Sequence, residues 1–281
     1  MAYFEEIDRL EPTRRPTGRV VMRQQWRELL FLHWPVPIEE LRPLLPPQLS
    51  LDTFDGQAYI GLVPFTMRNV RPTLLPPFPP LSNFHEINVR TYVHYQGREP
   101  GVWFFSLDAA NAIAVRIARA WFALPYYYAN MTLRHEQPEK PNTHTQSDDH
   151  TDNYTTDNHT SPSGRSATDH CTTHYTTERL WPNPLPACSE LQWTPAGEIR
   201  AAEPGTLDHF LIERYILYAE KKGELYRGKV HHSPYPVQTA ILHSLQENLI
   251  AQAGIMRPET PPHIHYASGV DVSIYPLQKV M

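Results

Sequence analysis

Three residues with different polar groups alternate along one short stretch of the chain: Glu86, Asn88 and Arg90. In an extended strand, alternate residues project to the same face about 7 Å apart, so a carboxyl, an amide and a guanidinium group would share one surface. If that surface is turned inward, the three groups line a cavity that can bind a small polar molecule. If it is turned to solvent, they are ordinary surface residues, and alternation alone leaves both alternatives open.

Histidines occur in two closely spaced pairs, His231-His232 and His263-x-His265. Imidazoles at such spacings can supply metal ligands, but neither pair has a cysteine or a carboxylate at a recognisable distance along the chain. We therefore predict structural or hydrogen-bonding roles for both pairs and no metal site. His232, which precedes Ser233-Pro234, is the better candidate for a pocket residue.

The sequence carries no standard enzyme or cofactor signature. It has no glycine-rich phosphate loop, no Gly-x-Ser-x-Gly elbow, no His-Glu-x-x-His and no paired Cys-x-x-Cys. We therefore predict no cofactor. A helix is expected over 108–122, and in it Arg116 and Arg119 are three apart and share a face. One of them turned inward would pair with an anion; otherwise they are a solvated pair.

Composition excludes several classes of function. The 281 residues include 25 Lys+Arg and 30 Asp+Glu, a formal net charge of −5, and show no basic stripe, so no nucleic-acid partner is expected. The acidic N-terminus lacks the apolar core of a secretory signal, and the most apolar stretch, 109–124, contains two arginines and is too short to cross a bilayer. With only Cys171 and Cys188, the chain is expected in a reducing cytoplasm, without a membrane partner. Self-association into a homo-oligomer stays open.

One segment, 137–179, differs in composition from the rest. Between Gln137 and Arg179 there is no Val, Ile, Leu, Met, Phe or Trp, and threonine and histidine are frequent. Such a segment gains too little hydrophobic free energy to offset the entropy lost on ordering, so we predict a disordered, low-complexity insertion in a surface loop. The remainder of 1–281 is predicted to form a single domain.

Outside this insertion, the chain alternates mainly in the strand period. We predict strands at 57–67, 85–95, 102–107, 126–134, 224–232 and 270–275, and helices at 108–122, 207–218 and 237–249. Tight turns between strands favour hairpins and hence an antiparallel sheet. The predicted class is α+β and mainly β, with a strongly curved or closed sheet, a β-barrel, flanked by helices.

Five runs of sequence resemble the YqjF-like family of uncharacterised bacterial proteins. The runs are FHEINVRTYV at 84–93, GVWFFSLDA at 101–109, ARAWFALPYY at 118–127, PGTLDHFLIERY at 204–215 and VHHSPYP at 230–236, and the resemblance spans nearly the whole chain outside the insertion. The resemblance implies the acetoacetate decarboxylase-like fold, in which a β-barrel encloses a small-molecule cavity.

The resemblance also implies what the chain lacks. Decarboxylases of that superfamily use one lysine to form a Schiff base with a keto acid and a second to lower its pKa. Tyr126 and Tyr127 stand where those lysines are expected, and only Glu86 and Arg119 match the pattern by type. A phenol cannot form an iminium, so Schiff-base decarboxylation is not carried over.

We therefore predict a protein that binds a small carbonyl- or carboxylate-bearing molecule, with arginine as the anion partner. The first alternative is a non-Schiff-base lyase or decarboxylase that moves protons with Tyr126 or Tyr127, Glu86 and His232. The second is an interaction protein whose segment 137–179 carries the biological role.

Overall fold

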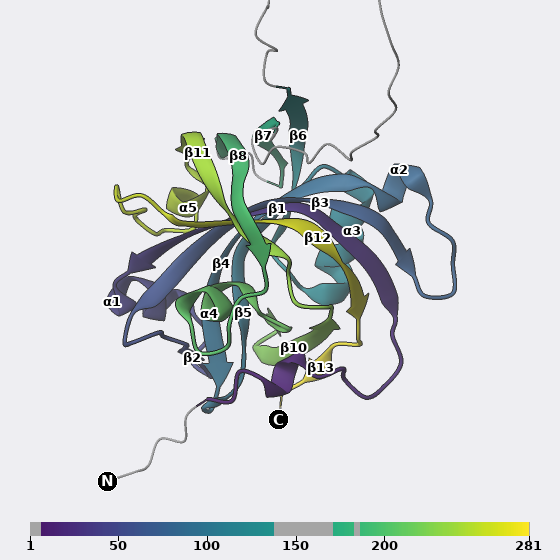
Figure 1. The fold of residues 1–281 in the computed structure, drawn as a ribbon. Coiled ribbons are helices and arrows are strands. Elements are labelled where there is room, and N and C mark those ends of the chain that lie inside the picture. The colour runs from purple at the N-terminus through teal and green to yellow at the C-terminus, as the bar shows by residue number, and fades with distance from the viewer. Residues whose placement is uncertain (1–6, 138–170, 183–185, 281) are drawn as a thin grey trace, which may run out of the picture.

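The computed structural model describes residues 7–137, 171–182 and 186–280, and a single curved sheet dominates it (Figure 1). Most of its strands are long, whereas β2 has three residues and β13, near the C-terminus, has two. The strands are β1 (Met22–Val36), β2 (Leu49–Leu51), β3 (Ala58–Pro72), β4 (Phe84–Tyr95), β5 (Arg98–Ala109), β6 (Tyr126–Glu136), β7 (Thr172–Trp181), β8 (Cys188–Arg200), β9 (Ile216–Lys221), β10 (Glu224–His231), β11 (Val237–Glu247), β12 (His263–Ile274) and β13 (Gln278–Lys279). The predicted mainly-β, α+β class is confirmed.

The strand pairings return on themselves. The order is β13-β10-β9-β5-β6-β7-β8-β11-β12-β1-β3-β4-β2, and in addition β4 pairs with β5 and β10 pairs with β12. A continuous circuit of pairings thus runs through β5, β9, β10, β12, β1, β3 and β4. The expectation of a wholly antiparallel sheet is wrong at two junctions, because β5 pairs in parallel with both β6 and β9. The connection between β5 and β6 contains a helix, which is what a parallel neighbour requires.

The two faces of the sheet at β4 differ in character. Ile87 and Val89 point into an apolar cluster shared with β1, β3 and β8. The other face carries Glu86, Asn88 and Arg90, all buried, followed by Tyr92, which packs in a second cluster with aromatic residues of β1 and β3. The open question about this strand is thereby answered: its polar face is turned inward.

The helices are short. They are α1 (Ile38–Leu41), α2 (Pro79–Ser82), α3 (Ala112–Phe122), α4 (Leu207–Ile212) and α5 (Leu249–Gln252), with 3-10 turns at Glu11–Thr13 and Arg42–Leu44. The start predicted for α3 is wrong, since Asn111 and not Asp108 caps it, accepting a hydrogen bond from the Ala114 amide. Thr206 caps α4 as predicted, but this helix ends at Ile212 and the chain continues into β9. In the described part of the chain, no helix is long and apolar enough to span a membrane.

The helix predicted over 237–249 is wrong, because most of this segment is strand β11. Its apolar residues recur every four positions, a spacing typical of a helix face. The segment instead pairs along its length with β8, from Val237 opposite Arg200 to Glu247 opposite Ser189, with two register shifts. Tertiary pairing with a neighbouring strand overrides local periodicity in such cases.

The predicted boundary of the disordered insertion is also wrong at its end. Residues 138–170 lie outside the described part of the chain, but 172–179 belong to β7, which pairs with β6 and β8. Alternate residues of β7, namely Thr173, Tyr175, Thr177 and Arg179, are buried. β-Branched threonine is favoured in strands, so a segment poor in aliphatic residues can still form one.

Candidate ligand-binding site

Glu86 and Tyr126 meet in the interior of the structure. The Tyr126 hydroxyl donates a hydrogen bond to Oε2 of Glu86 at 3.1 Å, and Glu86 is 2% exposed. The sheet explains the contact, because β5 pairs with β4 on one side and with β6 on the other, opposing Ala109 to Glu86 and Leu107 to Tyr126. Two residues 40 positions apart are thus brought to one place.

The environment favours the neutral forms of both groups. Burial raises the pKa of Glu86 to about 8, an effect that the hydrogen bond from Tyr126 opposes and the nearby Asp108 carboxyl reinforces. Burial, together with the Glu86 carboxyl, raises the pKa of Tyr126 well above its ordinary value. Near neutral pH, Glu86 is therefore mostly protonated, and the Tyr126 hydroxyl stays neutral and donates a hydrogen bond.

A buried ion pair, overlooked in the sequence, lies beside this contact. Arg179 donates from Nε and Nη2 to the two oxygens of Asp108 at 2.6 and 2.7 Å, and the two side chains are 4% and 0% exposed. The Arg179 guanidinium lies 3.7 Å from the centre of the Tyr127 ring. Tyr127 is therefore a stacking partner of Arg179. Its link to the predicted site beside Tyr126 is indirect and runs through the Arg179–Asp108 ion pair.

Asn88 and Arg90 continue the polar face of β4 beyond Glu86. Arg90 donates from Nη2 to the Leu211 carbonyl at 3.3 Å, and its guanidinium lies 5.6 and 5.8 Å from the ring centres of Phe31 and Tyr92. Within the described residues, Nε of Arg90 and Oδ1 of Asn88 are buried and form no hydrogen bond. Both side chains thus have hydrogen-bonding capacity that the described residues do not use.

Ring contacts link His232, which directly follows β10, to the residues around Glu86. Trp26 contacts both His232 and Phe65, each at 5.9 Å between ring centres, and Phe65 lies directly opposite Glu86 in the register of β3 and β4. The His232 ring stacks on Tyr215 at 4.4 Å and uses Nδ1 to bond the Ser233 carbonyl. Burial lowers the pKa of His232 to about 4, so the ring is neutral at pH 7.

The five residues Glu86, Asn88, Arg90, Tyr126 and His232 are hereafter called the Glu86 cluster. The Nε2 atom of His232 is buried and, among the described residues, has no hydrogen-bond partner. A second line of ring contacts ties the cluster together, from Arg90 over Phe31 to Tyr235 and on to His232, with 5.4 and 4.6 Å for the last two steps.

Arg119 does not join the Glu86 cluster. Its side chain is exposed on α3, donates to the Tyr126 carbonyl at 2.7 Å and lies over the ring of Trp181. It lines a surface pocket of about 500 Å³ together with Phe104 and Tyr218. Of the arginines predicted for the site, the buried one is Arg90, on β4.

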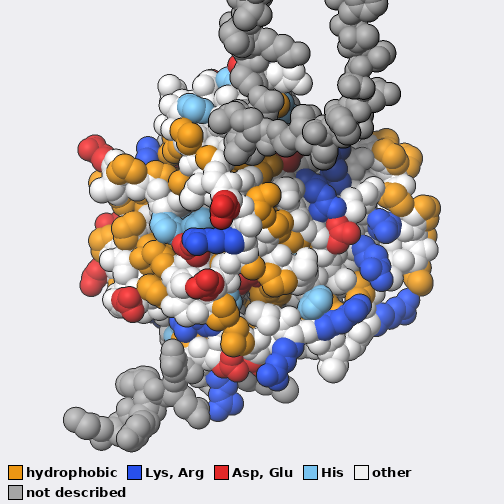
Figure 2. All heavy atoms as spheres, viewed as in Figure 1, with side chains coloured by type: hydrophobic (Ala, Val, Ile, Leu, Met, Phe, Trp, Pro, Cys, Tyr) orange, Lys and Arg blue, Asp and Glu red, His pale blue; other side chains and the backbone are white. Residues whose placement is uncertain are grey.

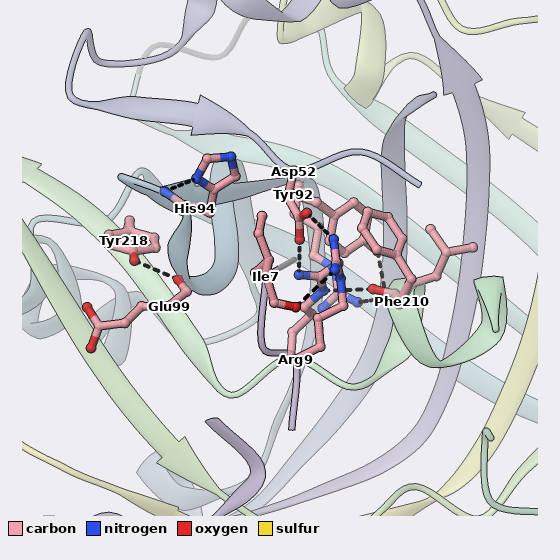
Figure 3. Close-up of polar contacts among 12 residues, drawn as sticks. Ile7, Arg9, Asp52, Tyr92, His94, Glu99, Phe210 and Tyr218 are labelled. Atoms are coloured by element: carbon pink, nitrogen blue, oxygen red, sulfur yellow. Dashed lines mark hydrogen bonds and ion pairs between the residues drawn. The ribbon is translucent and has the colours of Figure 1, made fainter. Parts of the chain in front are cut away.

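A charged network around Asp52 lies next to Tyr92, two residues after Arg90 on β4 (Figure 3). Asp52, 1% exposed, accepts from Arg9 at Oδ1 and from Arg214 at Oδ2, and the Arg214 guanidinium lies 4.7 Å from the Tyr92 ring centre. The Tyr92 hydroxyl bonds the Leu211 carbonyl and Nε2 of His33, each at 2.7 Å. His33 was not predicted: a lone histidine between apolar residues gives no sequence signal.

No buried lysine is found among the lysines that the structure describes. Lys221, Lys222 and Lys279 are exposed, and Lys229 is half-buried with its ammonium group paired to Glu99. Lys140 lies outside the described residues. In the part of the chain that is described, the Glu86 cluster therefore contains a carboxyl, an amide, a guanidinium, a phenol and an imidazole, and no amine.

Similar solved structures share this fold. An acetoacetate decarboxylase from Legionella pneumophila superposes with a TM-score of 0.56 at 11% identity, covering 96% of this chain and 94% of that one. An acetoacetate decarboxylase-like enzyme from Sphingomonas wittichii RW1 gives 0.54 at 11%, with 94% of each chain covered. The enduracididine biosynthesis enzyme MppR gives 0.55 at 11%, covering 94% of this chain and 91% of that one. At such identities the likeness shows the acetoacetate decarboxylase-like fold alone.

Sequence comparison identifies the family. The chain is 37% identical over 265 residues to the uncharacterized protein YqjF of Bacillus subtilis (strain 168), and the match covers 94% of each protein. Residues 23–271 match the family model DUF2071, described as an uncharacterized conserved protein. This span contains every member of the Glu86 cluster. The chain therefore belongs to the DUF2071, or YqjF-like, family, whose member here has an acetoacetate decarboxylase-like fold.

Proposed function

We propose that the protein binds a small carbonyl- or carboxylate-bearing molecule at the Glu86 cluster, with Arg90 as the anion partner and without a Schiff base. One observation carries the proposal: three buried polar atoms of the cluster, Oδ1 of Asn88, Nε of Arg90 and Nε2 of His232, have no hydrogen-bond partner among the described residues.

Such atoms are costly to bury. Leaving a buried donor or acceptor unpaired costs about 1–3 kcal/mol, and folded proteins pair nearly all of them. The three atoms differ in their hydrogen-bonding roles. Nε of Arg90 is a donor and Oδ1 of Asn88 is an acceptor. Nε2 of His232 is an acceptor because Nδ1 carries the ring proton that it donates to the Ser233 carbonyl. A ligand with an anionic or carbonyl oxygen at one end and a hydroxyl or N–H group at the other fits this pattern.

A structural neighbour supports the same ligand class. MppR has been solved in complex with pyruvate, which bears both a carbonyl and a carboxylate group. The shared fold makes keto acids the first compounds to try here. The position of Tyr126 and the surface location of the described lysines support non-covalent binding, since only an amine can condense with a ketone to an iminium.

The test is a calorimetric titration with a panel of α- and β-keto acids. We expect at least one to bind, and Arg90→Gln to weaken that binding about 10- to 100-fold, because a hydrogen bond to a charged group contributes about 1.5–3 kcal/mol. Arg116→Gln, which removes an exposed arginine from α3, is the matched control and should leave affinity unchanged. Equal losses in both variants, or no binding by any keto acid, would reject the proposal. Borohydride treatment with the bound ligand should yield no covalent adduct on a lysine.

A second candidate is a lyase or decarboxylase that works without a Schiff base. The observation in its favour is that Glu86, which accepts a hydrogen bond from Tyr126, has a pKa of about 8, close to neutral pH. Release of carbon dioxide from a panel member by the natural protein, lost in Tyr126→Phe, would establish this candidate over pure binding. Binding without turnover across the panel would leave the first proposal standing alone.

A further inference from the structure

Two histidines and an aspartate converge on one point at the junction of α4 and β12. Nε2 of His263 lies 2.8 Å, and Nε2 of His265 lies 3.2 Å, from Oδ1 of Asp208. Alternation along β12 places both imidazoles on one face of the strand, and the packing of α4 brings the carboxylate to them. No metal site is predicted at this histidine pair because no carboxylate lies at a recognisable ligand spacing along the chain, but the fold brings one from 55 residues away.

The spacing of these atoms suits a single metal ion. One ligand atom from each of the three residues can be chosen such that all lie within 4.8 Å of one another. Ligands held about 2.1 Å from a common ion are about 3.0–3.4 Å from each other in octahedral or tetrahedral geometry. The two N···O distances, 2.8 and 3.2 Å, are close to this range. Two imidazoles and one carboxylate are a donor set that binds Zn²⁺ and Fe²⁺ while leaving coordination positions open.

The surroundings leave room for such open positions. All three residues line a pocket of about 610 Å³, together with Arg200 and Gln238. The side chain of His265 is 7% exposed, that of Asp208 22% and that of His263 39%, so the group extends from the wall of the pocket toward its mouth. Figure 2 shows histidine side chains next to acidic and basic ones on the viewed face, in the region above α4. Arg200 approaches Oδ2 of Asp208 at 3.5 Å but is largely exposed and can move away.

We propose that His263, His265 and Asp208 form a mononuclear site for a divalent transition-metal ion of the Zn²⁺ type, with coordination positions open to this pocket. None of the three residues belongs to the Glu86 cluster, so this proposal stands independently of keto acid binding. The competing interpretation is a metal-free hydrogen-bond network in which both histidines only hold Asp208.

The experiment titrates the full-length, metal-free protein with Zn²⁺ by calorimetry, and with Co²⁺ while its visible absorption is recorded. We expect the natural protein to bind one more Zn²⁺ ion than either single variant, His263→Ala or Asp208→Asn, or to bind that ion about 100-fold more tightly. Losing a metal ligand should cost at least as much affinity as losing a residue that only orients a ligand. Cobalt bands should appear in the natural protein and be lost in both variants. His243→Ala removes an exposed histidine on β11 and should change neither result.

The histidines at 144, 150, 159 and 170 contribute the same background to every variant, so only the difference between proteins is interpreted. Circular dichroism and the Tm of the metal-free variants show whether each has folded. Identical titrations for the natural protein and a folded His263→Ala, or no cobalt bands in the natural protein, would overturn the proposal in favour of the hydrogen-bond network.

Discussion

Replacing Arg179 with methionine is expected to lower the free energy of unfolding by about 3–5 kcal/mol, the cost of removing one partner from a buried ion pair. The substitution keeps much of the side-chain volume but leaves the Asp108 carboxylate, 0% exposed, without its two hydrogen bonds. Burial already raises the pKa of Asp108, an effect that Arg179 opposes, so the variant should take up a proton at Asp108. Urea denaturation at pH 7 measures the loss.

Two further variants separate this effect from a general response to mutation. Adding Asp108→Asn to Arg179→Met removes the carboxyl that must otherwise be protonated or buried without its partner, and should restore part of the stability. Asp271→Asn disrupts the ion pair with Arg27, whose side chains are 29% and 72% exposed, and should cost less than about 1 kcal/mol. A loss below about 1 kcal/mol in Arg179→Met would show that the buried ion pair of Arg179 and Asp108 does not stabilise the fold.

The stability of the protein is expected to fall with rising pH because of Glu86. The pKa of Glu86 is about 8 in the folded state against an ordinary 4.5, so between these values the folded protein holds a proton that the unfolded chain has released. Stability rises with pH only where the unfolded state binds more protons, and here it binds fewer. The contribution is therefore fully present below pH 4.5 and is lost as pH rises to 8, by about 1.4 kcal/mol per pH unit and about 5 kcal/mol in all.

Glu86→Gln is the matched comparison, since glutamine preserves the shape and can accept the hydrogen bond from Tyr126 but does not titrate. Relative to this variant, the natural protein should lose about 3 kcal/mol of unfolding free energy between pH 5.5 and 7.5. Denaturation curves at several pH values give the difference directly. A pH-independent difference would mean that Glu86 is ionised throughout, and that its carboxyl is better solvated than the structure indicates.

Much of the sheet could be predicted because strand periodicity and turns are local signals. The predicted strands at 57–67, 85–95, 102–107, 126–134 and 224–232 each fall on an observed strand. The helix predicted at 237–249 failed because its partner β8 is distant in sequence and contributes the pairing that local periodicity cannot show. Residues 172–179 of the threonine-rich β7 are predicted to belong to the disordered insertion because they include no aliphatic residue, although alternate residues of this strand are buried.

The candidate site was predictable only in part, for a similar reason. Family resemblance pointed to Glu86 and Tyr126, and alternation placed Asn88 and Arg90 on the face of Glu86. Alternation could not say that this face is inside, and it could not pair Asp108 with Arg179, 71 residues away. Asp108 was instead interpreted as a helix cap, a role that Asn111 fills. Contacts between distant strands depend on the closed circuit of pairings, which no local pattern encodes.

A crystal structure grown with the tightest-binding keto acid of the panel tests the central claim most directly. The account predicts an oxygen of the ligand within hydrogen-bond distance of Nε of Arg90, further polar contacts to Asn88 or His232, and no covalent bond to any lysine. The account would be contradicted if ordered water occupied Nε of Arg90, Oδ1 of Asn88 and Nε2 of His232 while the ligand was bound elsewhere, such as in the surface pocket beside Arg119.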